Sequence, residues 1–189
     1  MTPQEATARV ESLLALLEQA KTSDYIGEGV SQLAHALQAA ARARAAGAPV
    51  NEILAALLHD VGHLCAGPSA PNMEGLGVLR HEEVGADHLA GLGFCADVVD
   101  LVRGHVAAKR YLVGAEPGYA ARLSEASRAT LRHQGGPLST SERRAFEALP
   151  HFRALLRVRA WDEAAKQRDL RVDDLSSYAS LLRDHLLHG

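Results

Sequence analysis

Residues 57–63 read LLHDVGH, so His59 and Asp60 are adjacent and His63 follows His59 by four positions. Imidazole nitrogens and carboxylate oxygens are common ligands of transition metals. On a helix, His59 and His63 would share a face, while Asp60 would point about 100° away from His59. A carboxylate placed in this way can bridge two ions through its two oxygens. The stretch therefore predicts a metal centre with one or two ions, whose other ligands lie elsewhere in the chain.

The sequence on both sides of this stretch predicts an all-α fold. No segment alternates apolar and polar residues for long enough to indicate a strand. Capping residues and helix-stopping residues give the expected boundaries. The first part of the chain is expected to form a helix that opens with the capping box of Thr2, Pro3 and Glu5 and ends near Lys21, a helix over Ser31–Ala46, and a helix that is capped by Asn51 and runs through Leu58 to about Leu64.

A stretch rich in glycine and proline, Ala66–Gly77, predicts a loop after the third helix. Such loops often border active sites. Ser139 and Glu142 form another possible capping box. Further helices are expected at about residues 80–91, 96–111, 119–132, 141–149, 151–168 and 173–187. With 189 residues and no obvious linker, the chain is expected to be a single domain over residues 1–189.

Composition narrows the class of protein. The chain is 47% hydrophobic and 23% charged, and no apolar run reaches the roughly 20 residues that a membrane helix needs. We find no secretory signal, and Cys65 and Cys95 lie outside any CxxC pattern, so we expect a cytoplasmic protein with reduced thiols. The net charge of -3 argues against a nucleic-acid partner. No Walker A motif or GxGxxG fingerprint is present.

The charge is distributed unevenly along the chain. Residues 1–102 carry 5 basic and 13 acidic side chains, a net of -8, whereas residues 103–189 carry 15 basic and 10 acidic side chains, a net of +5. Solvated helix faces would explain this pattern. The alternative is that the second half supplies cations to an anionic substrate.

Four further residues, each on a different expected helix, are candidate metal ligands. These are His35, His81, His105 and Asp162. Together with the pair at 59–60 they form the ordered pattern H...HD...H...H...D, which resembles the metal signature of the HD-domain superfamily. This resemblance implies a single HD-domain helical bundle. Most proteins of that superfamily are phosphohydrolases, in which metal ions activate water against a phosphate ester.

Several longer segments point to a narrower family. They are DYIGEGVSQLAHALQ, RHEEVGADHL, GHVAAKRYLV, LSEASRATLRHQGGP and RAWDEAAK. Together they resemble the mixed-valent diiron oxygenases of the PhnZ type, which cleave the carbon–phosphorus bond of 1-hydroxyphosphonates, and more distantly inositol oxygenase. The core motifs run from about Asp24 to Lys166. The resemblance implies two iron ions in the Fe(II)/Fe(III) state as cofactors, with O2 as co-substrate.

The resemblance also implies roles for the candidate residues. His35, His59, Asp60 and Asp162 would hold one iron, His81 and His105 would hold the other, and Asp60 would bridge them. Lys109, Ser127, Thr130, Arg159 and His63 are similar to the family's contacts with the phosphonate group. Tyr25 would act as a lid on the open iron position, and Glu28 would pair with the cationic amine of the substrate.

The implied reaction is O2-dependent cleavage of a 1-hydroxyphosphonate such as 2-amino-1-hydroxyethylphosphonate, which would give inorganic phosphate and glycine. A primary amine is the first choice and an N-methylated analogue is the alternative, because a quaternary ammonium group favours an aromatic cage and only Tyr25 with Tyr111 or Trp161 could contribute to one. Two alternatives stay open. One is an HD phosphohydrolase that uses Mn, Mg or Zn on a nucleotide or other phosphate ester, and the other is a metal-binding regulatory module without turnover.

Overall fold

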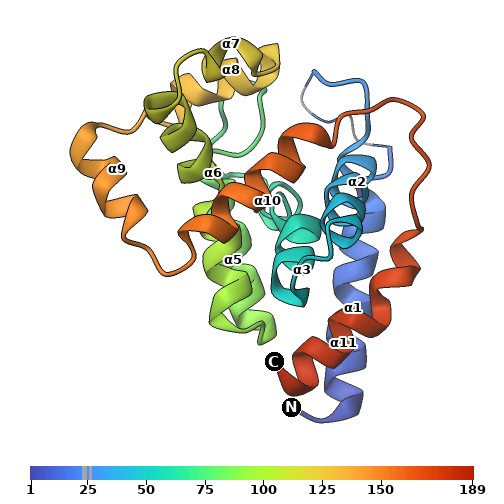
Figure 1. Cartoon of the computed structure of the whole chain (residues 1–189). Helices are drawn as coiled ribbons and strands as arrows, with labels where there is room; N and C mark the ends of the chain where they lie inside the picture. The colour runs from blue at the N-terminus through green and yellow to red at the C-terminus, as the bar shows by residue number, and fades with distance from the viewer. Residues whose placement is uncertain (23–24, 26) are drawn as a thin grey trace.

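The fold is all-α, as the sequence predicts, in a computed structural model that describes residues 1–22, 25 and 27–189. Figure 1 shows the arrangement of its helices. In chain order they are α1 (Pro3–Gln19), α2 (Gln32–Ala45), α3 (Val50–Leu58), α4 (Gly62–Cys65), α5 (His81–Leu92), α6 (Ala96–Ala115), α7 (Tyr119–Arg122), α8 (Glu125–His133), α9 (Thr140–Glu147), α10 (Phe152–Ala164), the 3-10 helix η1 (Leu175–Tyr178) and α11 (Ala179–His188).

Local capping signals mark several helix starts correctly. The capping boxes at Thr2 and Ser139 are both formed, and the Ser31 side chain accepts a hydrogen bond from the backbone N–H of Ala34. The cap predicted at Asn51 is wrong. The N-cap of α3 is Pro49, and the Asn51 side chain instead donates to Asp97 at 3.1 Å. The ring of Pro49 fixes the backbone angle φ just before the first turn, and α3 begins there without a side-chain cap.

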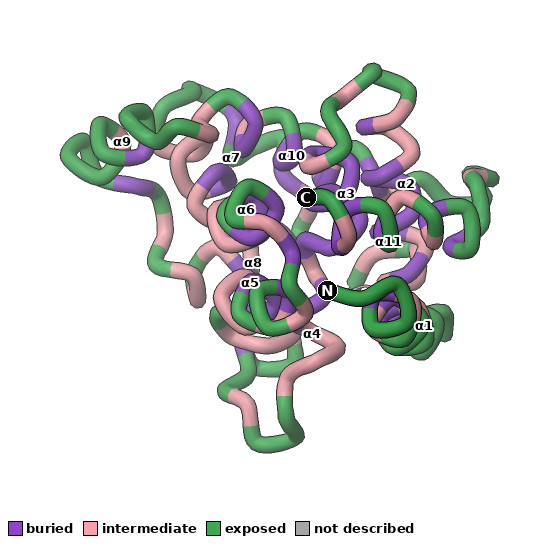
Figure 2. The backbone as a smooth tube through the Cα atoms, turned by 90° about the horizontal axis from the view of Figure 1, so that it is seen from below, coloured by how far each residue is buried: buried purple, intermediate pink, exposed green. Residues whose placement is uncertain are grey.

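Helix α3 is the centre of the core. All of its residues from Glu52 to Leu58 are buried. Because a helix that is apolar on most sides needs cover on all of them, α3 packs against α2, α6 and α10. Figure 2 shows the buried stretches of these helices gathered in the middle of the molecule. The end of α3, where the metal motif begins, is thereby placed at the centre of the fold.

Helices α1 and α11 pack against each other, and the two chain ends lie close together (Figure 1). Their shared apolar residues join the same core cluster, including Leu13 and Leu182. Helix α9 lies at the opposite edge, against α6. None of the described helices has the length and apolar character that crossing a membrane requires.

The third helix expected from the sequence is divided in two. Helix α3 ends at Leu58 and α4 begins only at Gly62, so His59, Asp60 and Val61 form a tight turn between them. Val61 is buried and Leu64 packs against the core, so the apolar pattern continues across the break. The expected end near Leu64 is confirmed, since α4 ends at Cys65, but the expected continuity of the helix is wrong because the periodicity of buried residues does not reveal this turn.

Candidate active site

The turn that carries His59 and Asp60 lies directly against the start of α5. A Cβ atom added to Gly62 would lie 1.9 Å from the carbonyl oxygen of His81. Gly85, on the facing side of α5, is itself so close that a Cβ there would lie 3.0 Å from the Gly62 nitrogen. Glycine at 62 therefore permits an approach that brings His81, the first residue of α5, beside the His-Asp pair.

The six candidate metal ligands come together in two adjoining groups. One group holds His35, His59 and Asp162, and the other holds Asp60, His81 and His105; within each group the ligand atoms all lie within 4.8 Å of one another. They come from α2, the turn after α3, α5, α6 and α10. Helices α2, α6 and α10 pack around α3, and α5 packs against α4 and α6, which together assembles the cluster.

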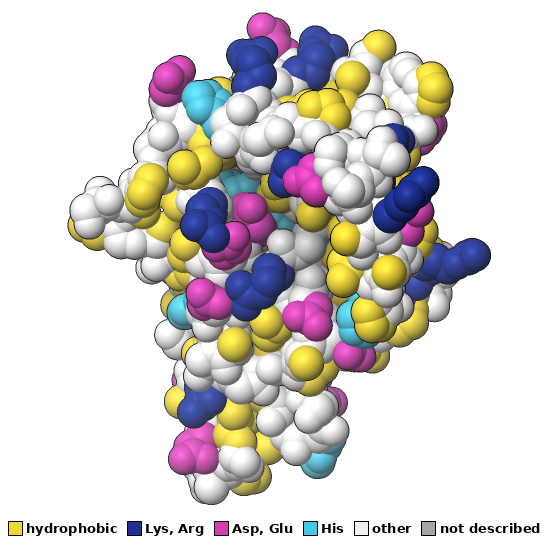
Figure 3. All heavy atoms as spheres, turned by 90° about the vertical axis from the view of Figure 1, so that its left-hand side faces the viewer, with side chains coloured by type: hydrophobic (Ala, Val, Ile, Leu, Met, Phe, Trp, Pro, Cys, Tyr) yellow, Lys and Arg dark blue, Asp and Glu magenta, His cyan; other side chains and the backbone are white. Residues whose placement is uncertain are grey.

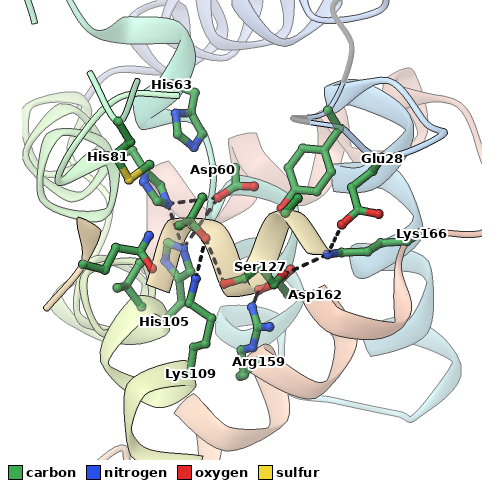
Figure 4. Close-up of a pocket in the computed structure, with 16 residues that line it drawn as sticks. Glu28, Asp60, His63, His81, His105, Lys109, Ser127, Arg159, Asp162 and Lys166 are labelled. Atoms are coloured by element: carbon green, nitrogen blue, oxygen red, sulfur yellow. Dashed lines mark hydrogen bonds and ion pairs between the residues drawn. The ribbon is translucent and has the colours of Figure 1, made fainter. Parts of the chain in front are cut away.

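Asp60 lies between the two groups with one oxygen toward each. Its Oδ2 atom is 3.3 Å from His59 Nε2, and its Oδ1 atom is 3.3 Å from His81 Nε2. Figure 4 shows Asp60 beside His81 and His105 at one wall of the cavity. A carboxylate in this position can share its two oxygens between two ions.

Hydrogen bonds to the backbone fix the orientation of the four histidine rings. Their Nδ1 atoms lie 2.8 Å (His35), 2.9 Å (His59), 3.3 Å (His81) and 2.7 Å (His105) from carbonyl oxygens. A carbonyl oxygen can only accept, so in each case Nδ1 carries the proton and donates. The neutral ring then presents an unprotonated Nε2 to the cluster, which is the form that binds metal.

With Nδ1 protonated, the unprotonated Nε2 atoms of neighbouring histidines face each other, and this shows whether the site suits metal ions. The Nε2 atoms of His35 and His59 are 3.1 Å apart, as are those of His81 and His105. Asp60 Oδ2 and Asp162 Oδ1 are buried without a hydrogen-bond partner among the described residues. Unpaired buried acceptors are costly, and a cation in each group would satisfy all of them. The donor set therefore fits two metal ions.

The electrostatics of the cluster also favour positive charge. Burial opposes the charged form of His59, yet the carboxylates of Asp60 and Asp162 raise the pKa of His59 to about 9, so in the absence of a metal ion a proton on Nε2 takes the place of the cation, and metal binding would displace that proton. Burial likewise opposes ionisation of Asp162, but the Arg159 guanidinium and neighbouring histidines hold its pKa well below the usual range. Burial also opposes ionisation of Asp60, but His59 and hydrogen bonds from the neighbouring histidines hold the pKa of Asp60 well below its usual range, so both carboxylates are anionic at neutral pH.

A cavity of about 40 Å³ opens beside the second group of ligands (Figure 4). All seven candidate substrate contacts line it, whereas the candidate metal ligands His35 and His59 do not. The lining residues are Tyr25, Glu28, Asp60, His63, Met73, His81, His105, Val106, Lys109, Ala126, Ser127, Thr130, Gln134, Arg159, Asp162 and Lys166.

Two cations form one wall of this cavity. Lys109 is buried and donates to the Thr130 hydroxyl at 3.0 Å, and Thr130 in turn donates to the Ser127 carbonyl oxygen at 3.2 Å. The hydroxyl proton of Thr130 is thereby engaged, so Thr130 orients Lys109. Arg159 donates through Nη1 to Asp162, while its buried Nη2 has no hydrogen-bond partner among the described residues. This wall can receive an anion.

His63 differs from the four ligand histidines in its proton position. Its Nδ1 accepts a hydrogen bond from the backbone N–H of Val78 at 3.0 Å, so the neutral ring carries its proton on Nε2. Burial lowers the pKa of His63 to about 3. The ring stacks on His81 with centroids 4.0 Å apart. His63 is therefore a neutral hydrogen-bond donor at the cavity.

Tyr25 and Glu28 line the cavity from the segment between α1 and α2. The Tyr25 ring stacks on His35 with centroids 3.9 Å apart and an interplanar angle of 13°. Burial and the charge of Asp60 raise the pKa of Tyr25 well above its ordinary value. The carboxylate of Glu28 is paired with Lys166 at 2.7 Å. Asp24, where the expected core motifs begin, lies outside the described residues.

The structure brings neither of the other aromatic candidates to the cavity. The Tyr111 hydroxyl donates to Glu147, and its ring packs against Phe146 and Phe152. Trp161 packs against the hydrophobic core. Among the residues that the structure describes, Tyr25 is the one Phe, Tyr or Trp side chain in the cavity lining. The described residues thus form no aromatic cage at the cavity.

Sequence reasoning assigned no role to three residues that shape the site: Gly62, Lys166 and Gln38. A glycine within an expected helix is itself a signal, because glycine weakens a helix unless close packing requires it. Lys166 ends one of the quoted segments and lines the cavity. Gln38 is buried and bonds the backbone of Gln167 twice, at 2.8 and 3.0 Å. No pattern in the sequence distinguishes Gln38 from other helix residues.

Charges on the outer surface are mixed rather than segregated. The face shown in Figure 3 carries acidic, basic and histidine side chains interspersed over the molecule. The excess of cations in the second half of the chain is found in part within the cavity, where it contributes Lys109, Arg159 and Lys166.

Comparison with known proteins adds a family and named relatives. The model of the HD domain matches residues 30–148. An uncharacterized protein of Acanthamoeba polyphaga mimivirus is 39% identical over 94% of this chain and 81% of its own length. The 1-hydroxy-2-(trimethylamino)ethyl-phosphonate dioxygenase (glycine-betaine-forming) of Leisingera caerulea is 38% identical over 92% of this chain and 88% of its own. The hydroxymethylphosphonate dioxygenase of Gimesia maris is 38% identical over 96% of this chain and 90% of its own.

Proposed function

The chain belongs to the HD-domain family, and from that premise we propose that it uses bound metal and O2 to cleave the carbon–phosphorus bond of a 1-hydroxyphosphonate. The observation that carries this proposal is the pair of relatives, 38% identical over more than nine-tenths of this chain, that are both named as hydroxyphosphonate dioxygenases. Inorganic phosphate and a carboxylic acid would be the products.

The two ligand groups are proposed to hold two irons. His35, His59 and Asp162 would bind one, His81 and His105 the other, and Asp60 would bridge them. A pair of irons in the Fe(II)/Fe(III) state supplies the redox chemistry that O2 activation needs and that Zn or Mg lacks. The backbone bonds to Nδ1 support this proposal, because they hold every ring with Nε2 toward the cluster.

The phosphonate group is proposed to lie against the cationic wall. Lys109 and Nη2 of Arg159 would donate charge-assisted hydrogen bonds to its oxygens, and His63 would donate from Nε2. Among the described residues this Nη2 makes no hydrogen bond, and its ion-pair partner Glu163 is 4.0 Å away. Lys109 and Arg159 line the same small cavity as Asp60. A substrate bound there would present its C1 hydroxyl toward the second ligand group.

Tyr25 is proposed to cover the cavity until substrate arrives. Tyr25 lies outside the helices, its ring stacks on His35, and it lines the cavity that a substrate would occupy. Movement of Tyr25 would open the cavity, and its return would exclude water from the reacting groups.

Dependence on O2 is the experiment that tests this function. Protein purified under mild reduction is analysed for iron and for the electron-spin signal of a mixed-valent pair, and is then incubated with hydroxymethylphosphonate and 2-amino-1-hydroxyethylphosphonate with and without O2. Phosphate release should require O2 and consume it. Turnover that persists without O2, or that is confined to phosphate esters, would instead establish an HD phosphohydrolase. Binding of a phosphonate without turnover or O2 consumption would establish a regulatory module.

A further inference from the structure

Lys166 makes three hydrogen bonds at the side of the cavity that lies away from His63 and His81 (Figure 4). Its Nζ atom is 2.7 Å from Glu28 Oε1, 3.0 Å from Ser124 Oγ and 3.1 Å from Ser127 Oγ. An ammonium group has three hydrogens, so these three acceptors use all of them. Lys166 is therefore fully engaged within the protein.

The pair of Lys166 and Glu28 is shielded from solvent. Both side chains are 14% exposed. Burial opposes ionisation of Glu28, but the hydrogen bond from Lys166 holds the pKa of Glu28 below its ordinary value. A substrate ammonium that reached Glu28 would have to displace Lys166 or approach it closely, and like charges in a partly buried site repel strongly. The charge of Glu28 is already balanced.

The backbone on both sides of Lys166 is tied to α2. The Ala165 carbonyl accepts from His35 Nδ1 at 2.8 Å. The Gln167 carbonyl accepts from Gln38 Nε2 at 2.8 Å, and the Gln167 N–H donates to Gln38 Oε1 at 3.0 Å. The backbone from which the Lys166 side chain extends is therefore held in place on both sides. Its ammonium cannot leave the cavity by a shift of the chain without breaking these bonds.

Lys166 also orients a hydroxyl group at the phosphonate end. Because Lys166 donates to Ser127 Oγ, the hydroxyl hydrogen of Ser127 is directed away from the ammonium. Ser127 lines the cavity and is buried. The same lysine therefore neutralises Glu28 and turns Ser127 into a donor for an anion.

We propose that Lys166 determines the substrate range of the site, by occupying Glu28 and so favouring 1-hydroxyphosphonates whose C1 substituent carries no positive charge. This inference rests on the proposed function and narrows its substrate class. Hydroxymethylphosphonate is the simplest such compound. The expected contact between Glu28 and a substrate amine is thereby replaced by a contact within the protein. The cavity also lacks an aromatic cage for a methylated amine among the described residues.

The test compares two substrates of nearly equal shape, 2-amino-1-hydroxyethylphosphonate and 1-hydroxypropylphosphonate, which differ by an ammonium in place of a methyl group. The wild-type protein should have the higher kcat/KM for 1-hydroxypropylphosphonate. Lys166→Met frees Glu28, and the ratio of the two kcat/KM values should shift toward the amine by roughly 10- to 100-fold, the effect of one charge-assisted hydrogen bond. The ratio is informative even where loss of the Ser127 contact lowers both values.

Two further variants separate specificity from general damage. Glu28→Gln combined with Lys166→Met removes the freed carboxylate and should return the ratio to near the wild-type value. Lys21→Met makes the same substitution at an exposed lysine in the turn after α1 and should leave the ratio unchanged.

Binding of both phosphonates, measured by calorimetry without O2, gives the same ratio independently of turnover. If neither compound is turned over, the proposed function fails, while the binding ratio still decides the role of Lys166. A wild-type preference for the amine, or a ratio that Lys166→Met leaves unchanged in both measurements, would overturn the inference.

Discussion

Replacing Gly62 with alanine should dismantle one half of the proposed metal centre. The added Cβ would lie 1.9 Å from the His81 carbonyl oxygen, whereas real Cβ contacts essentially never fall below 3.0 Å. The turn and the start of α5 must therefore separate by at least about 1 Å. Metal sites tolerate ligand displacements of only about 0.2 Å, so His81 would leave coordination distance.

The effect on stability can be estimated from the same overlap. Overpacking of this kind costs about 1–3 kcal/mol, and each kcal/mol lowers Tm by about 2–4 °C in a chain of this size. We expect Tm to fall by about 2–12 °C. Bound metal should fall from two ions to about one per chain. The nearest atoms to the added Cβ belong to His81 and Gly85, and none belongs to His35, His59 or Asp162, which would hold the other ion.

Gly91→Ala provides a matched control. Gly91 is an exposed residue of α5, and a Cβ there would meet nothing within 4 Å. Alanine should leave the metal content at two ions and stabilise the helix by about 0.5–1 kcal/mol. Metal analysis and thermal unfolding of both variants check the reasoning. Two ions retained in Gly62→Ala, with a Tm equal to that of Gly91→Ala, would refute it.

Three further outcomes are expected. Asp60→Ala should remove both metals because the bridge is lost, whereas Asp162→Ala should spare one; metal analysis showing two ions in the Asp60 variant would contradict the bridging role. Burial and the Arg159 charge lower the pKa of Lys109 to about 7, so Lys109 is cationic below that pH and neutral above it. KM for a phosphonate should therefore rise as the pH increases from 6 to 9, and Lys109→Arg, which stays charged, should lose that rise; parallel profiles would exclude Lys109 as the cause. Glu52 is buried and accepts two hydrogen bonds from Arg157, at 2.6 and 2.8 Å, so Glu52→Gln should lower the free energy of unfolding by about 1–2 kcal/mol without altering metal content, as urea denaturation would reveal.

Features encoded by a few neighbouring residues were predictable. The capping boxes at Thr2 and Ser139 depend on a hydroxyl and a carboxylate three positions apart, and both are confirmed. The spacing of His35, His81, His105 and Asp162 suggested partners for the His-Asp pair, and the fold does bring those side chains together. Which ions they hold stays a prediction.

Features that depend on contacts between distant segments were not predictable. The turn after Leu58 exists because the His-Asp pair meets α5, a contact that apolar periodicity does not encode. Glu28 and Lys166 are 138 positions apart, so the sequence gives no reason to pair them. The expected pairing of Glu28 with a substrate amine followed from a family resemblance, which carries roles but not the local partners of each side chain.

Each of the three consecutive residues Ala165, Lys166 and Gln167 has a separate role. The first holds the ring of His35, the second projects into the cavity, and the third is clamped by Gln38. Insertion or deletion within this stretch would disturb both the proposed metal ligand His35 and the proposed determinant of substrate range, Lys166. Exchange of the middle side chain alone leaves both backbone anchors in place. During divergence within such a family, new substrate preferences could therefore arise by point substitution at position 166 without loss of the metal centre.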